Sequence, residues 1–340
     1  MGLMKKFLVW GSGAIGGTVG AYLARAGALV TFVDRDMNHV KTMNSKGLFI
    51  TGQFGEFTVP AEAYGTNEVP GKFNTILLCT KSQDTEKATK QLLSNLSEDG
   101  CVVSLQNGLN EEVISSIIGA RRTVGAFVNF GADYMKAGEI HYAGRGAVVL
   151  GEIDGRTTPR VEELHSWFLN FEKNAIITNN IWGYLWAKEA YGAMLFVTAL
   201  TNDSIADAFD LPAYRELYLA IAHEVLDVAK ALSIKPESFN GFEPEPLGSD
   251  DRAAALNSLN DMVVHNRRSE KTHSGIWRVI VVRKRKTEVD YQLGPVVGHA
   301  EKAGVAVPIT ARLIELIHDI ENGTRSLSTD NLDLLMEVLS

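Results

Sequence analysis

The sequence predicts an α/β protein in two parts, an N-terminal doubly wound parallel sheet followed by an all-helical domain. Two observations support this. Short runs rich in β-branched residues alternate with longer amphipathic runs over the first half of the 340 residues. Helical patterning then dominates from about residue 180 to the end. We therefore expect a dinucleotide-binding type of sheet domain over residues 1–179 and a helical substrate or dimerisation domain over residues 180–340.

Four buried strands are expected in the first domain, with helices between them. The strand candidates are KFLVW (6–10), ALVTFVD (28–34), NTILLCT (74–80) and CVVSL (101–105). Helical spacing occupies residues 16–27, 84–96 and 110–119. Continuous apolar strands joined by helices indicate a parallel sheet that is covered on both faces.

The other segments are less regular. Residues 123–153 hold short strands with glycine turns and are expected to form an antiparallel extension of the same domain. A helix over 160–174 and a last strand over 175–179 should follow. In the second domain, the Gly-, Pro- and acid-rich segment 239–254 predicts an exposed loop or lid. The apolar stripe of residues 217–232 predicts packing, either inside the domain or across a homodimer interface.

Composition excludes several classes of function. A net charge of −8 argues against a nucleic-acid binder, and the basic run at 283–286 predicts only a solvated surface. No apolar stretch reaches the roughly 20 residues of a membrane span. Two cysteines, both in predicted core strands, indicate a reduced, soluble, cytoplasmic protein. The histidines show neither HxH nor HExxH spacing, so no metal site is expected.

The strongest motif follows the first predicted strand, where WGSGAIGG contains a Gly-x-Gly-x-x-Gly pattern and opens a helix. Gly11 allows a tight turn, Gly13 lets a pyrophosphate approach the backbone, and Gly16 lets the helix lie close to the strand. Free N–H groups at the helix start then hold the anion. Asp34 ends the second strand, at the spacing expected for the acid that binds the adenosine ribose. The predicted cofactor-binding residues of the turn are Gly11, Ser12, Gly13, Ala14, Ile15 and Gly16.

The sequence leaves the choice between NAD and NADP open. The carboxylate of Asp34 accepts hydrogen bonds from a ribose 2′-hydroxyl and repels a 2′-phosphate, which favours NAD. Arg35 comes next and favours NADP, because its guanidinium can clamp that phosphate. Lys81, at the end of another predicted strand, supports NADP in the same way. The alternative for Arg35 is an ordinary exposed loop charge.

Three later segments carry candidate catalytic residues. SLQNGLN places Asn107 just past the carboxyl end of a strand, where doubly wound sheets bind ligands, although an Asn-Gly pair is also a common turn. YLWAKEAYGAMLF carries Lys188 in a nearly apolar helix, so its ammonium either snorkels to the surface or lines a cleft. Glu288 lies near the start of a later helix, where simply opposing the helix dipole is the alternative.

Together, these segments resemble the ketopantoate reductases (2-dehydropantoate 2-reductases). The glycine turn, the TK of CTKSQ, the QNG of SLQNGLN, the WAK of the lysine helix, the HSG and TEVD segments and the final AGVAVP turn occur in the family's order over essentially the whole chain. The resemblance implies a Rossmann domain joined to a helical domain like that of 6-phosphogluconate dehydrogenase, with the active site in the cleft between them.

The resemblance also implies roles for single residues. Lys188 matches the general acid that protonates the carbonyl oxygen of a small 2-oxo acid while NADPH or NADH delivers hydride. An ammonium suits that role, because it stabilises the charge that develops on oxygen. Asn107 matches an asparagine near nicotinamide and substrate, and Ser274 a substrate-binding serine. Glu288 matches an acidic partner that would orient and tune Lys188.

The chain departs from the family's pattern in its second domain. Gly192 and Phe196 stand one and two turns after Lys188, where the family carries asparagines that bind the substrate hydroxyl. The stretch from Ser274 to Glu288 is also about two residues longer than usual. We therefore expect a more apolar or differently shaped pocket, and either ketopantoate or a more apolar analogue as substrate. A catalytically weak dinucleotide-binding sensor or scaffold is the alternative function.

Overall fold

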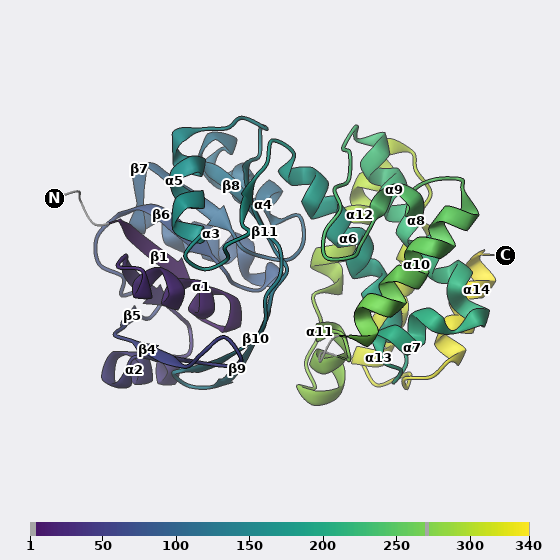
Figure 1. Ribbon diagram of the computed structural model, residues 1–340, viewed down its shortest axis with the longest axis horizontal. Coiled ribbons are helices and arrows are strands. Elements are labelled where there is room, and N and C mark those ends of the chain that lie inside the picture. Colours follow the sequence, from purple (N-terminus) through teal and green to yellow (C-terminus); the bar gives the residue numbers. More distant parts are fainter. Residues whose placement is uncertain (1–4, 269–271, 340) are drawn as a thin grey trace. The chain divides into compact units, whose positions relative to one another are not determined.

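The computed structural model describes residues 5–268 and 272–339. The chain divides into two compact units, of which the first ends at Ile181 and the second begins at Trp182 (Figure 1). All strands formed by the described residues belong to unit 1, and unit 2 is built from helices. The expected class, a sheet domain followed by a helical one, is confirmed.

The main sheet of unit 1 has the order β12-β11-β8-β7-β6-β1-β2-β5. The six strands from β5 to β8 are parallel, with β1 and β6 adjacent at the centre. This is the strand order of dinucleotide-binding doubly wound sheets, which bind ligands where the order reverses. The strands are β1 (Lys6–Trp10), β2 (Leu29–Val33), β5 (Glu62–Tyr64), β6 (Phe73–Leu78), β7 (Leu96–Ser104), β8 (Thr123–Val128), β11 (Val148–Glu152) and β12 (Ile176–Ile177).

Alternate side chains of the central strands enter two separate cores. Unit 1 has the helices α1 (Ala14–Arg25), α2 (Met37–Lys46), α3 (Thr85–Leu92), α4 (Asn110–Ile118) and α5 (Pro159–Phe168). Phe7 and Val9 of β1 share a core with α1 and α5, whereas Leu8 and Trp10 share one with α3 and α4. Burial on both faces explains why these strands are continuous apolar runs in the sequence.

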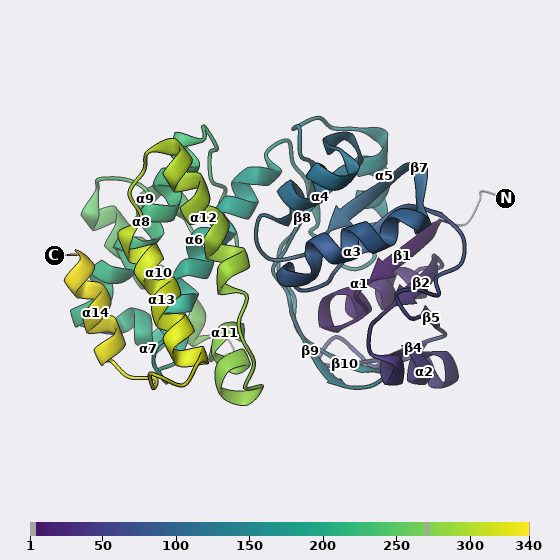
Figure 2. The same cartoon turned by 180° about the vertical axis from the view of Figure 1, so that it is seen from behind.

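A second sheet, with the order β4-β3-β10-β9, packs against α1 (Figure 2). Its strands are β3 (Leu48–Thr51), β4 (Phe57–Val59), β9 (Gly131–Lys136) and β10 (Glu139–Gly144). As expected, residues 123–153 extend the domain with antiparallel pairs, of which β9 and β10 lie in the second sheet and β11 joins the main sheet beside β8. The sequence did not predict the division into two sheets. The physical reason for the second sheet lies in α1, which is apolar on two sides. A Cβ on its Gly17 would lie 2.2 Å from Ile140 Cδ1, so the second sheet covers the side that the main sheet leaves open.

Unit 2 contains the helices α6 (Ile181–Thr198), α7 (Ile205–Asp210), α8 (Arg215–Ala231), α9 (Pro244–Leu247), α10 (Arg252–Arg267), α11 (Gly275–Trp277), α12 (Val289–Ala303), α13 (Pro308–Glu321) and α14 (Asp330–Leu339). A π-helical turn, η5 (Arg278–Val282), follows α11. The apolar stripe predicted at 217–232 forms α8, and its Leu217, Ile221 and Val225 are fully buried within the chain itself.

Residues 239–254 form the predicted exposed loop only in part, because some of their apolar side chains are buried. Phe242 and Leu247 are 1% and 2% exposed. The rings of Phe239 and Phe242 also pack on Tyr191 of α6, at 6.0 and 5.5 Å between centroids. The acidic residues of the segment, such as Glu243 and Glu245, stay exposed, and they dominated the pattern in the sequence.

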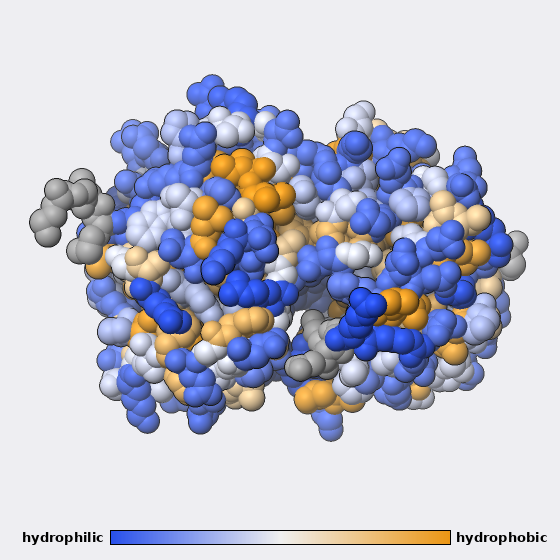
Figure 3. Space-filling view, in the orientation of Figure 1, coloured by the Kyte–Doolittle hydropathy of each residue, from blue (hydrophilic) through white to orange (hydrophobic). Residues whose placement is uncertain are grey.

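The surface agrees with the composition. Polar and charged residues dominate the face in Figure 3, and apolar residues appear there in small separate patches. The basic run at 283–286 is exposed, as expected.

Both cysteines are free thiols and neither forms a disulfide. Burial raises the pKa of the Cys79 and Cys101 thiols, so both stay protonated. Among the described residues, no helix is long and apolar enough to span a bilayer, and no cluster of side chains suits a metal ion.

Candidate active site

Gly11 and Gly16 shape the turn between β1 and α1. Gly11 has a φ of +96°, and a Cβ there would lie 2.9 Å from the backbone carbon of Cys79. A Cβ on Gly16 would lie 2.1 Å from the carbonyl oxygen of Gly11 and 2.9 Å from Val9 Cγ1. Both distances are shorter than carbon contacts allow, so neither position accepts a side chain without movement of the backbone.

Gly13 differs, because its missing side chain faces open space. Apart from the residues next to it in the sequence, no heavy atom of the described chain lies within 4 Å of a Cβ placed on it. Gly13 precedes α1, whose first turn begins with Ala14 and Ile15 and has neither a capping side chain nor an acidic residue. N–H groups at such a helix start need acceptors and carry partial positive charge. The turn therefore fits a pyrophosphate, whose oxygens would accept these hydrogen bonds.

The carboxylate of Asp34 lies against this turn. Its Oδ2 accepts hydrogen bonds from the N–H of Ser12 at 3.0 Å and from Ser12 Oγ at 3.2 Å. Its Oδ1 accepts the N–H of Asp36 at 3.0 Å. These three bonds fix the carboxylate at the end of β2, beside the end of β1. Oδ1 keeps a further lone pair, so a ribose hydroxyl could still donate to it.

The two cations predicted to bind a 2′-phosphate lie in the loops after β2 and β6. Arg35 Nη1 is 3.2 Å from Asp84 Oδ2, and the Arg35 side chain is 76% exposed. An ion pair this exposed contributes little stability, so another anion could replace Asp84. Lys81 is exposed and directly precedes the short helix η1 (Ser82–Asp84).

His39 links the glycine turn to the second sheet, which the sequence did not indicate. The N–H of Gly138 donates to its Nδ1 at 2.9 Å, so Nε2 carries the ring proton and donates to the carbonyl of Ser12, also at 2.9 Å. The ring is fully buried and contacts Tyr134 edge-on. Burial and the nearby Asp36 raise the pKa of Tyr134 to about 12, so its hydroxyl stays protonated and donates to that carboxylate.

We predict that His39→Ala will destabilise unit 1 and loosen the turn. The substitution leaves the buried N–H of Gly138 and the carbonyl of Ser12 without partners, which costs about 1–3 kcal/mol. Thermal unfolding should show a lower Tm, and titration should show a higher Kd for the nicotinamide nucleotide. Ser45→Ala is the matched control, because that hydroxyl bonds only within α2. Equal Tm values for the two variants would contradict the prediction.

A hydrogen-bond network joins the loops that follow β6 and β7. Gln106 Nε2 donates to the carbonyl of Thr80 at 2.9 Å and to Thr85 Oγ1 at 2.7 Å. Ser82 Oγ donates to the carbonyl of Asn107 at 2.7 Å. The loop of Asn107 is thus held through its backbone, whereas its side chain is exposed and makes no hydrogen bond within the described chain. The arrangement presents an amide at the carboxyl ends of the central strands.

In unit 2, helices α6 and α12 pack antiparallel. The rings of Trp186 and His299 meet edge-on at 5.6 Å, and Gln292 Oε1 lies 3.9 Å from a Cβ placed on Gly192. The earlier residue of α6, Trp186, meets the later residue of α12, and the later one, Gly192, meets the earlier one. The two helices therefore run in opposite directions. Lys188 lies between Trp186 and Gly192, one turn before Gly192 on the same face, and is half-buried.

The other two predicted residues of unit 2 occupy helix starts. Glu288 is half-buried and directly precedes α12. On α6, Phe196 is fully buried. Ser274 is 1% exposed, and its Oγ accepts the N–H of Trp277 at 3.1 Å, so it caps α11.

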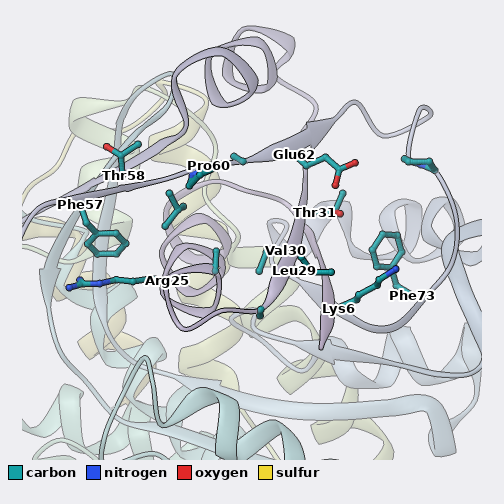
Figure 4. Close-up of a pocket in the computed structure, with 15 residues that line it drawn as sticks. Lys6, Arg25, Leu29, Val30, Thr31, Phe57, Thr58, Pro60, Glu62 and Phe73 are labelled. Atoms are coloured by element: carbon teal, nitrogen blue, oxygen red, sulfur yellow. The ribbon is translucent and has the colours of Figure 1, made fainter. Parts of the chain in front are cut away.

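A groove in unit 1 is not part of this arrangement. Lys6, Arg25 and Glu62 help to line it (Figure 4). It lies where β1 and β2 begin, at the edge of the sheet opposite the glycine turn.

Both halves of the chain match one enzyme family. Residues 7–155 match the profile described as ketopantoate reductase PanE/ApbA, and residues 180–321 match the profile of its C-terminal domain. The 2-dehydropantoate 2-reductase of Archaeoglobus fulgidus is 27% identical over 322 residues, which cover 94% of this chain and 99% of the relative. That of Pyrococcus horikoshii is 27% identical over 318 residues, covering 92% and 96%.

Solved structures agree on the fold. A D-mandelate dehydrogenase in complex with NADH and anilino(oxo)acetate has a TM-score of 0.81 at 21% identity, with 94% of this chain and 99% of that chain covered. A ketopantoate reductase from Ralstonia eutropha JMP134 has a TM-score of 0.78 at 24% identity, with the same coverage. The chain belongs to the ketopantoate reductase family and is an NAD(P)-dependent oxidoreductase that acts on CH–OH groups.

Proposed function

We propose that the protein reduces a small 2-oxo acid to the 2-hydroxy acid, with Lys188 as the general acid. The observation that supports this best is the position of Lys188, a half-buried ammonium on the apolar helix α6 of a chain that belongs to this family. Charged groups are removed from water at a considerable free-energy cost, so an ammonium in such a helix suggests a chemical use. The glycine turn, with Gly13 open, suits the cofactor that such a reaction needs.

In the proposed reaction, each residue has a separate role. NAD(P)H, when bound, supplies the hydride that reaches the carbonyl carbon of the substrate. Lys188 stabilises the negative charge that grows on the carbonyl oxygen and transfers a proton to it, which completes the alcohol. The resulting neutral amine regains a proton from water. We assign to the exposed amide of Asn107 a hydrogen bond to nicotinamide or substrate, to Glu288 the orientation and tuning of Lys188, and to Ser274 contacts with the substrate.

For the cofactor, we propose a preference for NADH over NADPH. The carboxylate of Asp34 is fixed beside the turn and would repel a 2′-phosphate. We predict that Asp34→Asn will reduce the NADH/NADPH ratio of kcat/KM about tenfold, because one charge–charge repulsion of ~1 kcal/mol or more is removed. Asparagine can still accept the Ser12 hydrogen bonds. An unchanged ratio would assign cofactor selection to Arg35 and Lys81 instead.

A screen tests the proposed reaction directly. Purified protein is mixed with NADH or NADPH and one of a series of 2-oxo acids, and nucleotide absorbance is followed in parallel. Oxidation of the nucleotide that depends on the oxo acid, with formation of the 2-hydroxy acid, is the expected result. Tight nucleotide binding without turnover of any oxo acid would overturn the proposal and leave a binding protein.

A further inference from the structure

Gln292 is a buried polar side chain that the mechanism above does not use. It is only 9% exposed. Within the described chain its amide makes no hydrogen bond, although an amide can donate two and accept two. Burying such a group without a partner costs about 1–3 kcal/mol in proteins. Neither polar atom of the amide is among the fully buried ones without a partner, so the amide stays accessible to solvent, and a ligand in the adjoining space could take the place of water there.

The surroundings of the amide show where such a ligand would bind. Gln292 Oε1 lies 3.9 Å from a Cβ placed on Gly192, and apart from the neighbouring residues of α6 no other described atom comes within 4 Å of it. Because Gly192 has no side chain, space remains beside the amide. Lys188 lies one helical turn away on the same face of α6, where i and i+4 positions are about 6 Å apart. The antiparallel contact of Trp186 with His299 holds α12 in this register.

We propose that Gln292 determines substrate specificity by hydrogen-bonding a neutral polar group, of the hydroxyl type, on the side chain of the 2-oxo acid. The inference rests on the proposed reduction at Lys188. A molecule whose carbonyl oxygen is held by that lysine extends its next few atoms over a distance of one helical turn, into the space that Gly192 leaves open. There the amide N–H can donate a hydrogen bond to a hydroxyl oxygen, or the amide oxygen can accept a hydrogen bond from the hydroxyl O–H. An aliphatic chain would leave the amide unpaired, so Gln292 discriminates against it.

Two substrates that differ by one atom test the proposal. 2-Dehydropantoate carries a hydroxyl on C4, and 3,3-dimethyl-2-oxobutanoate is the same molecule without it. The parent enzyme should favour the hydroxylated acid at least tenfold in kcat/KM, because a buried donor or acceptor left unpaired costs about 1–3 kcal/mol. Gln292→Leu, which keeps the size but not the polarity, should bring the ratio close to one. Tyr291→Phe, at an exposed position of the same helix, should leave the ratio as it is in the parent.

Other outcomes separate this inference from the proposed function. If both acids are reduced equally well by the parent, or if Gln292→Leu keeps the preference, the role of Gln292 is refuted while the reductase activity stands. If neither acid is reduced, calorimetry with pantoate and its 4-deoxy analogue in the presence of NAD(P)+ decides. Tighter binding of pantoate that is lost in Gln292→Leu upholds the contact, and equal binding of the two acids refutes it.

Discussion

Replacing Lys188 by alanine should lower kcat by about 10²–10⁴-fold, the usual contribution of a positioned general acid. The Kd for NADH should change little, because in our proposal Lys188 acts on the substrate oxygen and the nucleotide is held by the glycine turn. Loss of kcat together with kcat/KM is the pattern expected when an interaction made mainly in the transition state is removed. Steady-state kinetics and nucleotide titration measure the two quantities on the same preparations.

Two further variants sharpen this test. Lys188→Arg keeps a positive charge but holds its proton too tightly to donate it, so substrate should still bind while kcat stays low. Lys230→Ala, at an exposed position in the last turn of α8, is the matched control and should retain the parent's kcat. Full activity in Lys188→Ala would end the proposed mechanism, whatever the other variants do.

The parallel part of the main sheet could be predicted because its strands are buried on both faces. β1 was predicted with the bounds that the structure shows, Lys6–Trp10, since all its residues but the first are buried and no polar residue interrupts it. The same reasoning failed for β5, whose three residues Glu62–Tyr64 lie at the sheet edge and carry no continuous apolar run. Short edge strands leave little pattern in a sequence, because neighbouring strands determine their conformation more than their own side chains do.

The second sheet was missed for a different reason. Its strands come from two distant segments, and β3 pairs with β10 across about ninety residues of sequence. Nothing local in either segment specifies that pairing. The one available signal was the glycine content of α1, since Gly16, Gly17 and Gly20 allow close approach of neighbours on more than one side. Glycines on two sides of α1 therefore indicate that neighbouring elements pack closely against both of these sides.

The candidate site shows the same division. Residues whose spacing follows a known motif, such as the glycines of the turn and Asp34, were predicted from the sequence alone, and the structure places Asp34 against Ser12. His39 was not, because a lone histidine on a partly apolar helix is more often a core residue than part of a site. Gln292 was not predicted either, because the space beside its amide exists only where Gly192, on another helix, has no side chain. Such pairs become visible only once the packing of α6 against α12 is known.

Gly13 and Gly16 belong to one motif, yet we predict that alanine at each will fail in a different way. A methyl group on Gly16 would lie 2.1 Å from the carbonyl oxygen of Gly11. Backbone cannot move aside easily, so α1 must shift away from β1, at a cost of about 1–3 kcal/mol or more. Gly16→Ala should therefore lower the Tm of the nucleotide-free protein by several degrees, and its nucleotide binding should fall as a consequence.

Gly13→Ala should instead leave the Tm of the nucleotide-free protein nearly unchanged. Apart from the residues next to it in the sequence, its methyl group meets no atom of the described chain within 4 Å, and the φ of −68° is one that alanine readily adopts. The methyl group would, however, occupy the space through which a pyrophosphate approaches the first N–H groups of α1, so the Kd for NADH should rise at least tenfold. Thermal unfolding without nucleotide and fluorescence titration with it separate the two effects. Unaltered NADH binding in Gly13→Ala would show that the pyrophosphate does not lie over this turn, and the proposed role of the glycine motif would then be wrong even if Gly16→Ala behaves as expected.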